Sequence, residues 1–319
     1  MSAARPVHLA LVGPTAAGKS AVALEAAAAL GDVEIVSVDS MQVYRGMDIG
    51  TAKPDRSEQA AVPHHLLDLA DPWEDFSVAR FQQSAMEVLA GIEGRDRRAL
   101  LVGGTGLYFQ AIVDGLRLPG EDRRLRAELE AEAAAPEGLA ALYDELAALD
   151  PVAAGRIDPG NGRRIVRALE VTRASGRPFS SFGPGMFREN GGALPVQIAG
   201  LWTTRAAGAR RIAQRFAAME RGGLVEEVRR LAADARGLSR TARQAIGYKE
   251  VLDHLEGIAP SLEEAFERAV SRTRALARRQ RMWFRRDQRV VWVGVEENPL
   301  AALPAVLATW SRTPAKDRL

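Results

Sequence analysis

The chain has 319 residues, of which 47% are hydrophobic and 26% are charged, and its formal net charge is +2. This length can hold one large domain or two smaller ones with a substantial core. The sequence contains no cysteine, which excludes disulfides and thiolate zinc sites and fits a reducing compartment. No apolar run approaches the roughly 18 residues that a membrane span needs, and residues 1–6 are too short and polar for a secretory signal. We therefore expect a globular cytoplasmic protein without a membrane partner.

Charge is segregated along the chain. Residues 121–150 carry nine acidic side chains against three arginines, whereas residues 161–180 carry five arginines against one glutamate. Residues 261–290 carry nine arginines against four acids. Arginine suits forked contacts with phosphate and stacking on bases, but solvated helix faces produce the same pattern. The charge pattern alone leaves nucleic-acid binding and a plain charged surface equally open.

The first chemical motif is a phosphate-binding loop between an expected strand, 7–12, and an expected helix, 21–30. The pattern G-x-x-x-x-G-K-[ST] is carried by Gly13, Pro14, Thr15, Ala16, Ala17, Gly18, Lys19 and Ser20. Glycines let successive backbone N–H groups point inward, and the helix N-terminus adds partial positive charge. Lys19 would add a full charge, and the Ser20 hydroxyl would bind Mg²⁺. The loop predicts binding of a di- or triphosphate without deciding between them.

Two further strands are expected to end beside this loop. Residues 33–38 form a β-branched strand that ends at Asp39, and residues 98–102 form a strand that runs through glycines to Thr105. Ligands of parallel sheets bind at the carboxyl ends of the strands, so both side chains should lie on one rim. Asp39 could position Mg²⁺, act as a general base, or cap a helix or turn. Thr105 could bind substrate or serve as a turn hydroxyl.

The segment that follows the second strand has a weaker pattern. Residues 44–72 are interpreted as mostly loop, and residues 76–92 have helical apolar spacing. His64 and His65 are adjacent, so an extended chain would point them to opposite sides. They make a poor pair of metal ligands and are interpreted as loop or packing histidines.

The rest of the chain separates into a helical part and a part in which strands return. Helices without strands are expected over 122–134, 136–149 and 162–175, followed by a Gly/Pro-rich stretch at 176–195. Strands return at 196–202 and 290–293, with helices between them. The expected fold class is α/β, a P-loop NTPase-like parallel sheet of about five strands flanked by helices, with a helical insertion domain. The core would span 1–117 and 196–319, and the insertion 118–195.

Taken together, the motifs resemble one family. The segments in question are GPTAAGKS, DSMQVYRGMDIGTAKP, VPHHLLD, LLVGGTGLYF, NGRRIVRALEV with SGRP, RIAQRFAAM with GLVEEV, QAIGYKE and ARRQRMWFR. Their order is similar to that of bacterial tRNA dimethylallyltransferases, also called tRNA isopentenyltransferases. The resemblance covers about residues 8–293 and is most specific in DSMQVY and in IGYKE before RRQRMWFR.

The resemblance implies a reaction. A dimethylallyl group would move from dimethylallyl diphosphate to the exocyclic N6 amine of adenosine 37, next to the anticodon, in tRNAs that read codons starting with U. The phosphate loop with Mg²⁺ would hold the diphosphate, Lys19 would neutralise its charge, and Asp39 would take the proton from the amine. Thr105 would contact the substrate nucleotide. Arg211 and Arg215 would bind diphosphate or support the structure, and their roles stay unseparated.

The resemblance also implies a path for the anticodon stem-loop of tRNA. Its residues would be Asp39, Ser40, Met41, Gln42, Thr105, Arg126, Arg163, Arg164, Ile165, Val166, Arg167, Arg243, Gln244, Gly247, Tyr248, Arg278, Arg279, Gln280, Trp283 and Arg285. The C-terminal motif departs from the family at two positions, with Arg278 for a lysine and Met282 for a threonine. Arginine keeps the charge, whereas a hydroxyl contact at Met282 is lost. No exposed heptad pattern is seen, so a monomer is expected.

Three other functions are weighed against this one. A small-molecule phosphate-loop kinase would turn over an NTP and leaves the arginine clusters unexplained. An adenylate isopentenyltransferase would use free AMP and would not need those clusters. A nucleic-acid-binding module with a vestigial phosphate loop would keep its function when Lys19 is replaced.

Overall fold

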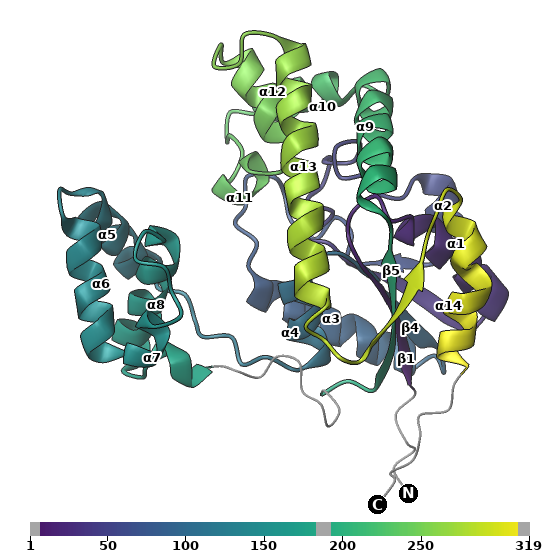
Figure 1. The fold of residues 1–319 in the computed structure, drawn as a ribbon, viewed down its shortest axis with the longest axis horizontal. Helices are drawn as coiled ribbons and strands as arrows, with labels where there is room; N and C mark the ends of the chain where they lie inside the picture. Colours follow the sequence, from purple (N-terminus) through teal and green to yellow (C-terminus); the bar gives the residue numbers. More distant parts are fainter. Residues whose placement is uncertain (1–6, 183–192, 312–319) are drawn as a thin grey trace, which may run out of the picture. The chain divides into compact units, whose positions relative to one another are not determined.

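The computed structural model describes residues 7–182 and 193–311 (Figure 1). The chain forms two compact units. The core unit comprises Met1–Val113 and Glu189–Leu319, and the inserted unit comprises Asp114–Arg188. The domain limits expected from the sequence pattern lie close to these, and the functional division into a core and a tRNA-contacting insertion stays a prediction.

The core unit is built on a six-stranded parallel sheet with the strand order β3-β2-β4-β1-β5-β6. The strands are β1 (His8–Val12), β2 (Val33–Val38), β3 (His64–His65), β4 (Arg98–Gly103), β5 (Val196–Trp202) and β6 (Val290–Gly294). The expected fold class is confirmed, with one strand more than expected. The extra strand, β3, has two residues and pairs Ile35 with His64 and Val36 with His65. A strand this short carries no alternating pattern, so the sequence did not indicate it.

Helices cover both faces of the sheet, as an all-parallel sheet requires. On one face, α1 (Lys19–Leu30), η2 (Pro299–Ala302) and α14 (Leu303–Trp310) share a core with Leu9, Leu11 and Leu201. On the other face, α3 (Val78–Glu93) and α4 (Gly106–Val113) share a core with Ala10 and Val12. The alternation along β1 therefore directs successive side chains into two separate cores.

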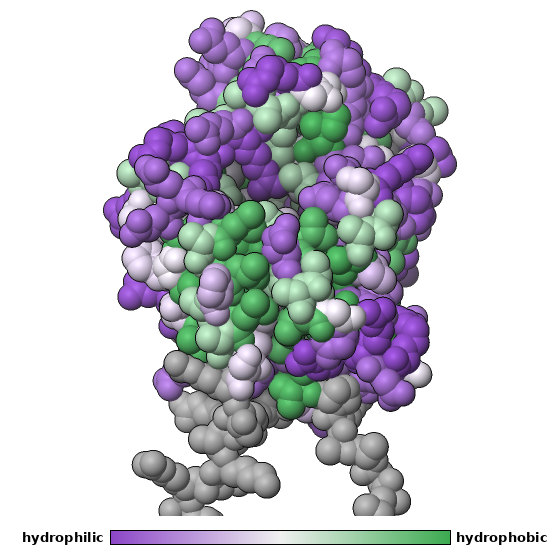
Figure 2. Space-filling model, turned by 90° about the vertical axis from the view of Figure 1, so that its right-hand side faces the viewer, coloured by the Kyte–Doolittle hydropathy of each residue, from purple (hydrophilic) through white to green (hydrophobic). Residues whose placement is uncertain are grey.

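The side of the molecule formed by α1 and α14 is partly apolar (Figure 2). Green apolar side chains gather there between purple hydrophilic regions. Partly buried residues that pack on the core of this face are Leu24, Leu30, Val293, Leu303 and Leu307.

The segment between β2 and α3 contains more regular structure than expected. Besides β3, it holds α2 (Arg56–Ala61), whose N-terminus has a capping box made by Asp55 and Glu58. An isolated parallel bridge joins Tyr44 to Ala70. The two ends of the segment are thereby held together.

Five helices lie between β5 and β6 in the chain. They are α9 (Arg205–Arg221), α10 (Leu224–Ala232), α11 (Arg240–Arg243), α12 (Tyr248–Leu255) and α13 (Leu262–Phe284). Residues 244–247 separate α11 from α12, and Gly247, directly before α12, has a φ of +96°. Helix α13, capped by Ser261, packs beside α9 and α12 and reaches α4 with its last turns (Figure 1).

The inserted unit contains helices and no strand among its described residues, 114–182. Its elements are α5 (Arg123–Ala134), α6 (Gly138–Leu149), α7 (Pro151–Ala154), α8 (Gly162–Ser175) and η1 (Phe179–Phe182). Buried leucines of α5, α6 and α8 form a core of its own. The expected Gly/Pro-rich stretch extends over 183–192, which lies outside the described residues. Within 7–182 and 193–311, no helix is long and apolar enough to cross a membrane.

Candidate active site

A glycine-bounded loop joins β1 to α1. Gly13 has a φ of +141° and Gly18, which precedes α1, has a φ of +88°. A Cβ on Gly13 would lie 2.4 Å from the carbonyl oxygen of Leu201, and one on Gly18 would lie 2.3 Å from the Cβ of Pro299. Both positions therefore require glycine. The first N–H groups of α1 and the positive end of its dipole are left at the loop, which is the arrangement that binds anions.

Lys19 is the first residue of α1, and its side chain reaches back over this loop. Its Nζ donates to the carbonyl oxygen of Pro14 at 2.8 Å. The pKa of Lys19 is lowered to about 8, first by burial and then by the charge of Arg215, while the charge of Asp39 acts in the opposite direction. Two cations and one carboxylate therefore share one partly desolvated pocket. An anionic ligand placed there would stabilise the charged form of Lys19.

The pocket beside the loop collects side chains from distant parts of the core unit. Its polar lining includes Thr15, Lys19, Ser20, Asp39, Gln42 and Arg215. The apolar lining comes from α1, β2 and β4 and includes Leu24, Ile35 and Val102. The site therefore combines a cationic, oxygen-rich end with an apolar wall.

Asp39 is held in a tight turn directly after β2. Its Oδ1 accepts from the backbone N–H groups of Met41 at 2.8 Å and Gln42 at 3.3 Å. The N–H of Ser40 donates to the Oγ1 of Thr105 at 3.3 Å. Because Val38 pairs with Gly103 in the parallel ladder, the turns after β2 and β4 lie side by side. The structure thus brings the neighbourhoods of Asp39 and Thr105 together at the rim.

The two arginines of α9 occupy different places. Arg215 lines the pocket and donates to the Oγ1 of Thr15 at 3.1 Å. Arg211 contacts the carbonyl oxygens of Ala16 at 3.5 Å and Glu297 at 3.2 Å, and also that of Glu296. Burial lowers the pKa of Arg215, while the charge of Asp39 raises it. Arg215 therefore faces the pocket, whereas Arg211 ties the loop to the segment before η2.

The end of α13 packs directly against the loops of the site. The Oε1 of Gln280 accepts from the N–H of Thr15 at 2.7 Å. A Cβ on Gly104 would lie 2.5 Å from the Nε2 of Gln280, and one on Gly106 would lie 2.2 Å from the Cδ1 of Trp283. Gln280 and Trp283, both predicted to bind tRNA, thus lie against the phosphate loop and the turn after β4.

Other predicted tRNA residues of the core unit differ in exposure. Arg278, Arg279 and Arg285 are exposed on and after the last turns of α13. Arg243 forms an ion pair with Glu256. Gln244 and Gly247, also predicted to bind tRNA, lie between α11 and α12. The arginines of α13 present charge at the surface, whereas the QAIGYKE segment is largely packed.

Tyr248 is fully buried beneath Gly50. A Cβ on Gly50 would lie 2.3 Å from the Cε2 of Tyr248, and the Tyr248 hydroxyl donates to Glu227 at 2.5 Å. The Glu227 carboxylate also accepts from the N–H groups of Asp48 at 3.1 Å, Ile49 at 3.0 Å and Gly50 at 3.3 Å. Burial and the neighbouring Glu227 raise the pKa of Tyr248. Tyr248 therefore supports a loop of the site from below.

In the inserted unit, some of the predicted tRNA residues are exposed, and the others are ion-paired or buried. Arg163 and Arg164 are exposed in the first turn of α8. Arg126 and Arg167 both pair with Glu170, whose side chain is fully buried. Ile165 and Val166 are buried in the core of this unit. Their assignment to tRNA stays a prediction.

The sequence interpretation missed one wall of the pocket. Thr51, Pro54, Glu58 and His64 line it, and all four come from the segment interpreted as mostly loop. The motif GTAKP within this segment was the available signal, and no role was attached to it. Its Lys53 is nearly buried, which is unusual for lysine.

The fold and the site together define a class of protein. A parallel α/β sheet, a phosphate loop that requires glycine at two positions, and an aspartate after the neighbouring strand are typical of phosphate-loop enzymes that act on a di- or triphosphate. The family model described as IPP transferase matches residues 42–287. The chain therefore belongs to this family of prenyl-transferring enzymes.

Individual relatives agree with the family model. A tRNA dimethylallyltransferase of Desulforudis audaxviator is 50% identical over 293 residues, which cover 92% of this chain and 93% of that protein. One of Geobacter metallireducens is 48% identical over 282 residues, which cover 88% and 90%. A crystal structure of tRNA isopentenylpyrophosphate transferase from Bacillus halodurans is 37% identical with a TM-score of 0.68, covering 95% and 96%. The resemblance carried by the sequence motifs is confirmed.

Proposed function

We propose that this protein transfers a dimethylallyl group from dimethylallyl diphosphate to the N6 amine of adenosine 37 in tRNAs that read codons starting with U. The products would be N6-(dimethylallyl)adenosine and diphosphate. The observation that carries the proposal is the convergence of Lys19, Arg215 and Asp39 on one pocket beside the phosphate loop. Family membership and the names of the relatives support dimethylallyl as the transferred group and tRNA as the acceptor.

The chemistry follows from what these side chains can do. The bond between the dimethylallyl carbon and the diphosphate oxygen breaks, and a bond from that carbon to N6 forms. The loop N–H groups, Lys19 and Arg215 stabilise the negative charge that develops on the leaving diphosphate. Asp39 accepts the proton that N6 loses, because an aromatic amine is a weak nucleophile without a base. Thr105 lies at the same rim, where we assign it a contact to the substrate nucleotide.

A divalent metal, assigned as Mg²⁺, fits the donors at the loop. Ser20 is exposed in the first turn of α1 and Asp39 lies in the same pocket, so a hydroxyl and a carboxylate oxygen are available. The described residues, 7–182 and 193–311, contain no group of three or more acidic or imidazole side chains that could hold a metal. Mg²⁺ commonly takes one or two protein ligands together with waters and substrate phosphates. When bound, the metal would neutralise charge on the diphosphate.

We further propose that the protein binds the anticodon stem-loop as a cytoplasmic monomer. Arg278 and Arg279 of α13 and Arg285 directly after it are exposed and positively charged. They lie close to the site, because Gln280 and Trp283 of the same segment pack against its loops. The target adenosine must leave the stacked loop to reach Asp39. Arg163 and Arg164 would add phosphate contacts from the inserted unit.

The test is incorporation of radiolabelled dimethylallyl diphosphate into unmodified tRNA in the presence of Mg²⁺. Asp39→Asn keeps the size of the side chain and removes the base, so acid-precipitable label should fall about a thousandfold. Asp32→Asn is the matched control, since Asp32 pairs with Arg98 at the opposite end of β2. Its transfer rate should equal that of the parent within about twofold.

Parallel reactions separate the alternatives. Label that enters AMP but not tRNA would identify an adenylate isopentenyltransferase. Consumption of ATP without incorporation of label would identify a kinase. Full tRNA binding and function after loss of Lys19 would identify a vestigial phosphate loop.

A further inference from the structure

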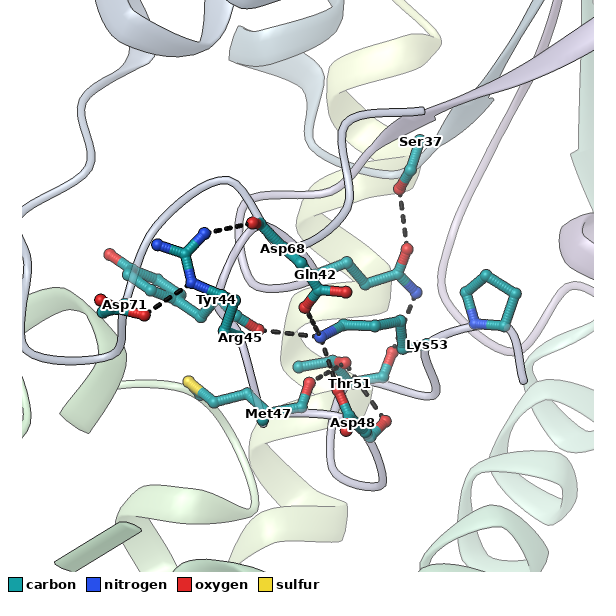
Figure 3. A network of polar contacts seen from close by, with 12 residues as sticks. Ser37, Gln42, Tyr44, Arg45, Met47, Asp48, Thr51, Lys53, Asp68 and Asp71 are labelled. Atoms are coloured by element: carbon teal, nitrogen blue, oxygen red, sulfur yellow. Dashed lines mark hydrogen bonds and ion pairs between the residues drawn. The ribbon is translucent and has the colours of Figure 1, made fainter. Parts of the chain in front are cut away.

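We propose that Lys53 is a positioning residue of the active site, which fixes the direction of the Asp39 carboxylate through Gln42. This inference rests on the proposed function. Figure 3 draws Lys53, Gln42 and the residues that hold them in the segment after β2, with the ammonium group of Lys53 at the centre of the network.

Lys53 is a nearly buried cation with all three donors in use. Its side chain is 4% exposed. Its Nζ donates to the carbonyl oxygen of Tyr44 at 2.8 Å and to carboxylate oxygens of Asp48 and Asp68 at 2.6 Å each. Tyr44 and Asp48 lie in the first part of the segment and Asp68 lies near its end, so the ammonium group joins these two parts. Desolvating a lysine is costly, and here the cost is offset only because every donor is satisfied.

The loop beside Lys53 is held in a conformation that needs such support. Ala52 and Asp68 have φ values of +47° and +55°, which L residues rarely adopt. The Thr51 hydroxyl donates to the carbonyl oxygen of Met47 at 2.7 Å. Glu227 fixes the N–H groups at the start of this loop, and Lys53 fixes its end. The loop is therefore anchored from two sides.

The anchored loop presents two carbonyl oxygens to Gln42. The Nε2 of Gln42 donates to Thr51 at 3.2 Å and to Ala52 at 3.1 Å, and its Oε1 accepts from the Ser37 hydroxyl at 2.7 Å. The side-chain amide is thus held at both ends, as Figure 3 shows for Ser37 and Gln42. The Gln42 amide has these three protein partners, and its contact with tRNA stays a prediction.

Gln42 connects this network to the proposed base. Its backbone N–H donates to the Oδ1 of Asp39 at 3.3 Å, beside the stronger donation from Met41. Because the side chain of Gln42 is held in place, its backbone is held as well. The backbone N–H of Gln42 then keeps the Oδ1 of Asp39 in one orientation. A shift of about 1 Å in a reacting group can cost about a hundredfold in rate. Lys53 thus acts through Gln42, without touching the reacting atoms.

The experiment compares Lys53→Met, Gln42→Ala and the double variant in the transfer assay. Lys53→Met should lower kcat about 10- to 100-fold and change KM for dimethylallyl diphosphate less than about threefold. In the Gln42→Ala background the same substitution should lower kcat less than about threefold, because the connection is already broken. Independent, multiplicative effects, or a change confined to KM, would overturn the proposal.

Two further variants keep the test decisive. Lys249→Met is the matched control, since Lys249 is also an ion-paired lysine but its partner is Asp253 in α12, outside the segment after β2. Its kcat should equal that of the parent.

If Lys53→Met does not fold, Asp48→Asn weakens one contact of Lys53 and should lower kcat a few-fold, again only when Gln42 is present. A parent without tRNA transfer refutes the proposed function, whereas a parent with transfer and additive variants refutes the role of Lys53 alone.

Discussion

Positive side chains serve opposite purposes in the two units. In the core unit, Lys19 and Arg215 point into a pocket where Asp39 is the neighbouring carboxylate. In the inserted unit, Arg126 and Arg167 close on the buried carboxylate of Glu170. Pairing lowers the free energy of a buried charge, whereas cations that face a pocket remain available to an anionic ligand. Partner carboxylates therefore separate the cations that the proposed function uses from those that hold the inserted unit together.

The largest effect should come from the cation of the phosphate loop. Lys19→Met removes the charge that faces the leaving diphosphate, so kcat/KM for tRNA prenylation should fall about a thousandfold. The unfolding midpoint should stay constant or rise, because burial of this ammonium group is unfavourable. The transfer assay and thermal unfolding measured on one preparation check both statements. A large loss of stability would mean that Lys19 is structural, like Arg126.

Removal of the buried carboxylate in the inserted unit should lower stability, in contrast to removal of Lys19 in the core unit. Glu170→Gln removes the carboxylate that Arg126 and Arg167 share and leaves Arg126 only a longer pair with Glu121 at 3.9 Å. The free energy of unfolding should fall by about 2 kcal/mol, below the values for fully buried pairs because both arginines are partly exposed. Denaturant unfolding measures this difference. Glu128→Gln, which breaks only an exposed pair with Arg124, is the control and should change little. Equal effects of the two substitutions would contradict the assigned structural role of Glu170.

The affinity for diphosphate should depend on pH, because it depends on the protonation of Lys19. Its pKa of about 8 lies below the ordinary value, so the ammonium form predominates below pH 8 and is lost as the pH rises through that value. Affinity for inorganic diphosphate should therefore weaken by up to about tenfold per pH unit above pH 8. Isothermal titration calorimetry between about pH 6.5 and 9.5 measures it. Lys19→Arg keeps its charge over this range, so its affinity should lose this dependence.

The smallest effects should come from the exposed arginines of α8. Arg163→Ala and Arg164→Ala should each weaken tRNA binding severalfold and reduce the slope of log Kd against log salt by about one. Filter binding at several salt concentrations measures that slope. Arg124→Ala removes an exposed arginine that pairs with Glu128 and should leave the slope unchanged. A uniform slope across all three variants would place the tRNA contact elsewhere.

The local motifs were predictable because their chemistry is local. The phosphate loop needs consecutive residues between a strand and a helix, and both the fold class and the family follow from such patterns. Asp39 and Thr105 could be assigned to one rim because parallel strands end at the same edge. The two-residue strand β3 could not be predicted, since His64 and His65 carry no strand pattern and pair only because Ile35 and Val36 lie beside them.

The amino-acid sequence by itself determined the parallel α/β class, the phosphate loop and the order of family motifs. Only the tertiary structure decided which charges are paired. Arg211 and Arg215 are one helical turn apart, yet one ties the loop to backbone carbonyls and the other lines the pocket. Tyr248 likewise reaches Gly50 from a distant part of the chain, whereas Lys53 and Gln42 find partners 5 to 15 residues away that the folded loops bring beside them. Such pairings depend on distances across the fold, and residue spacing along the chain does not contain them.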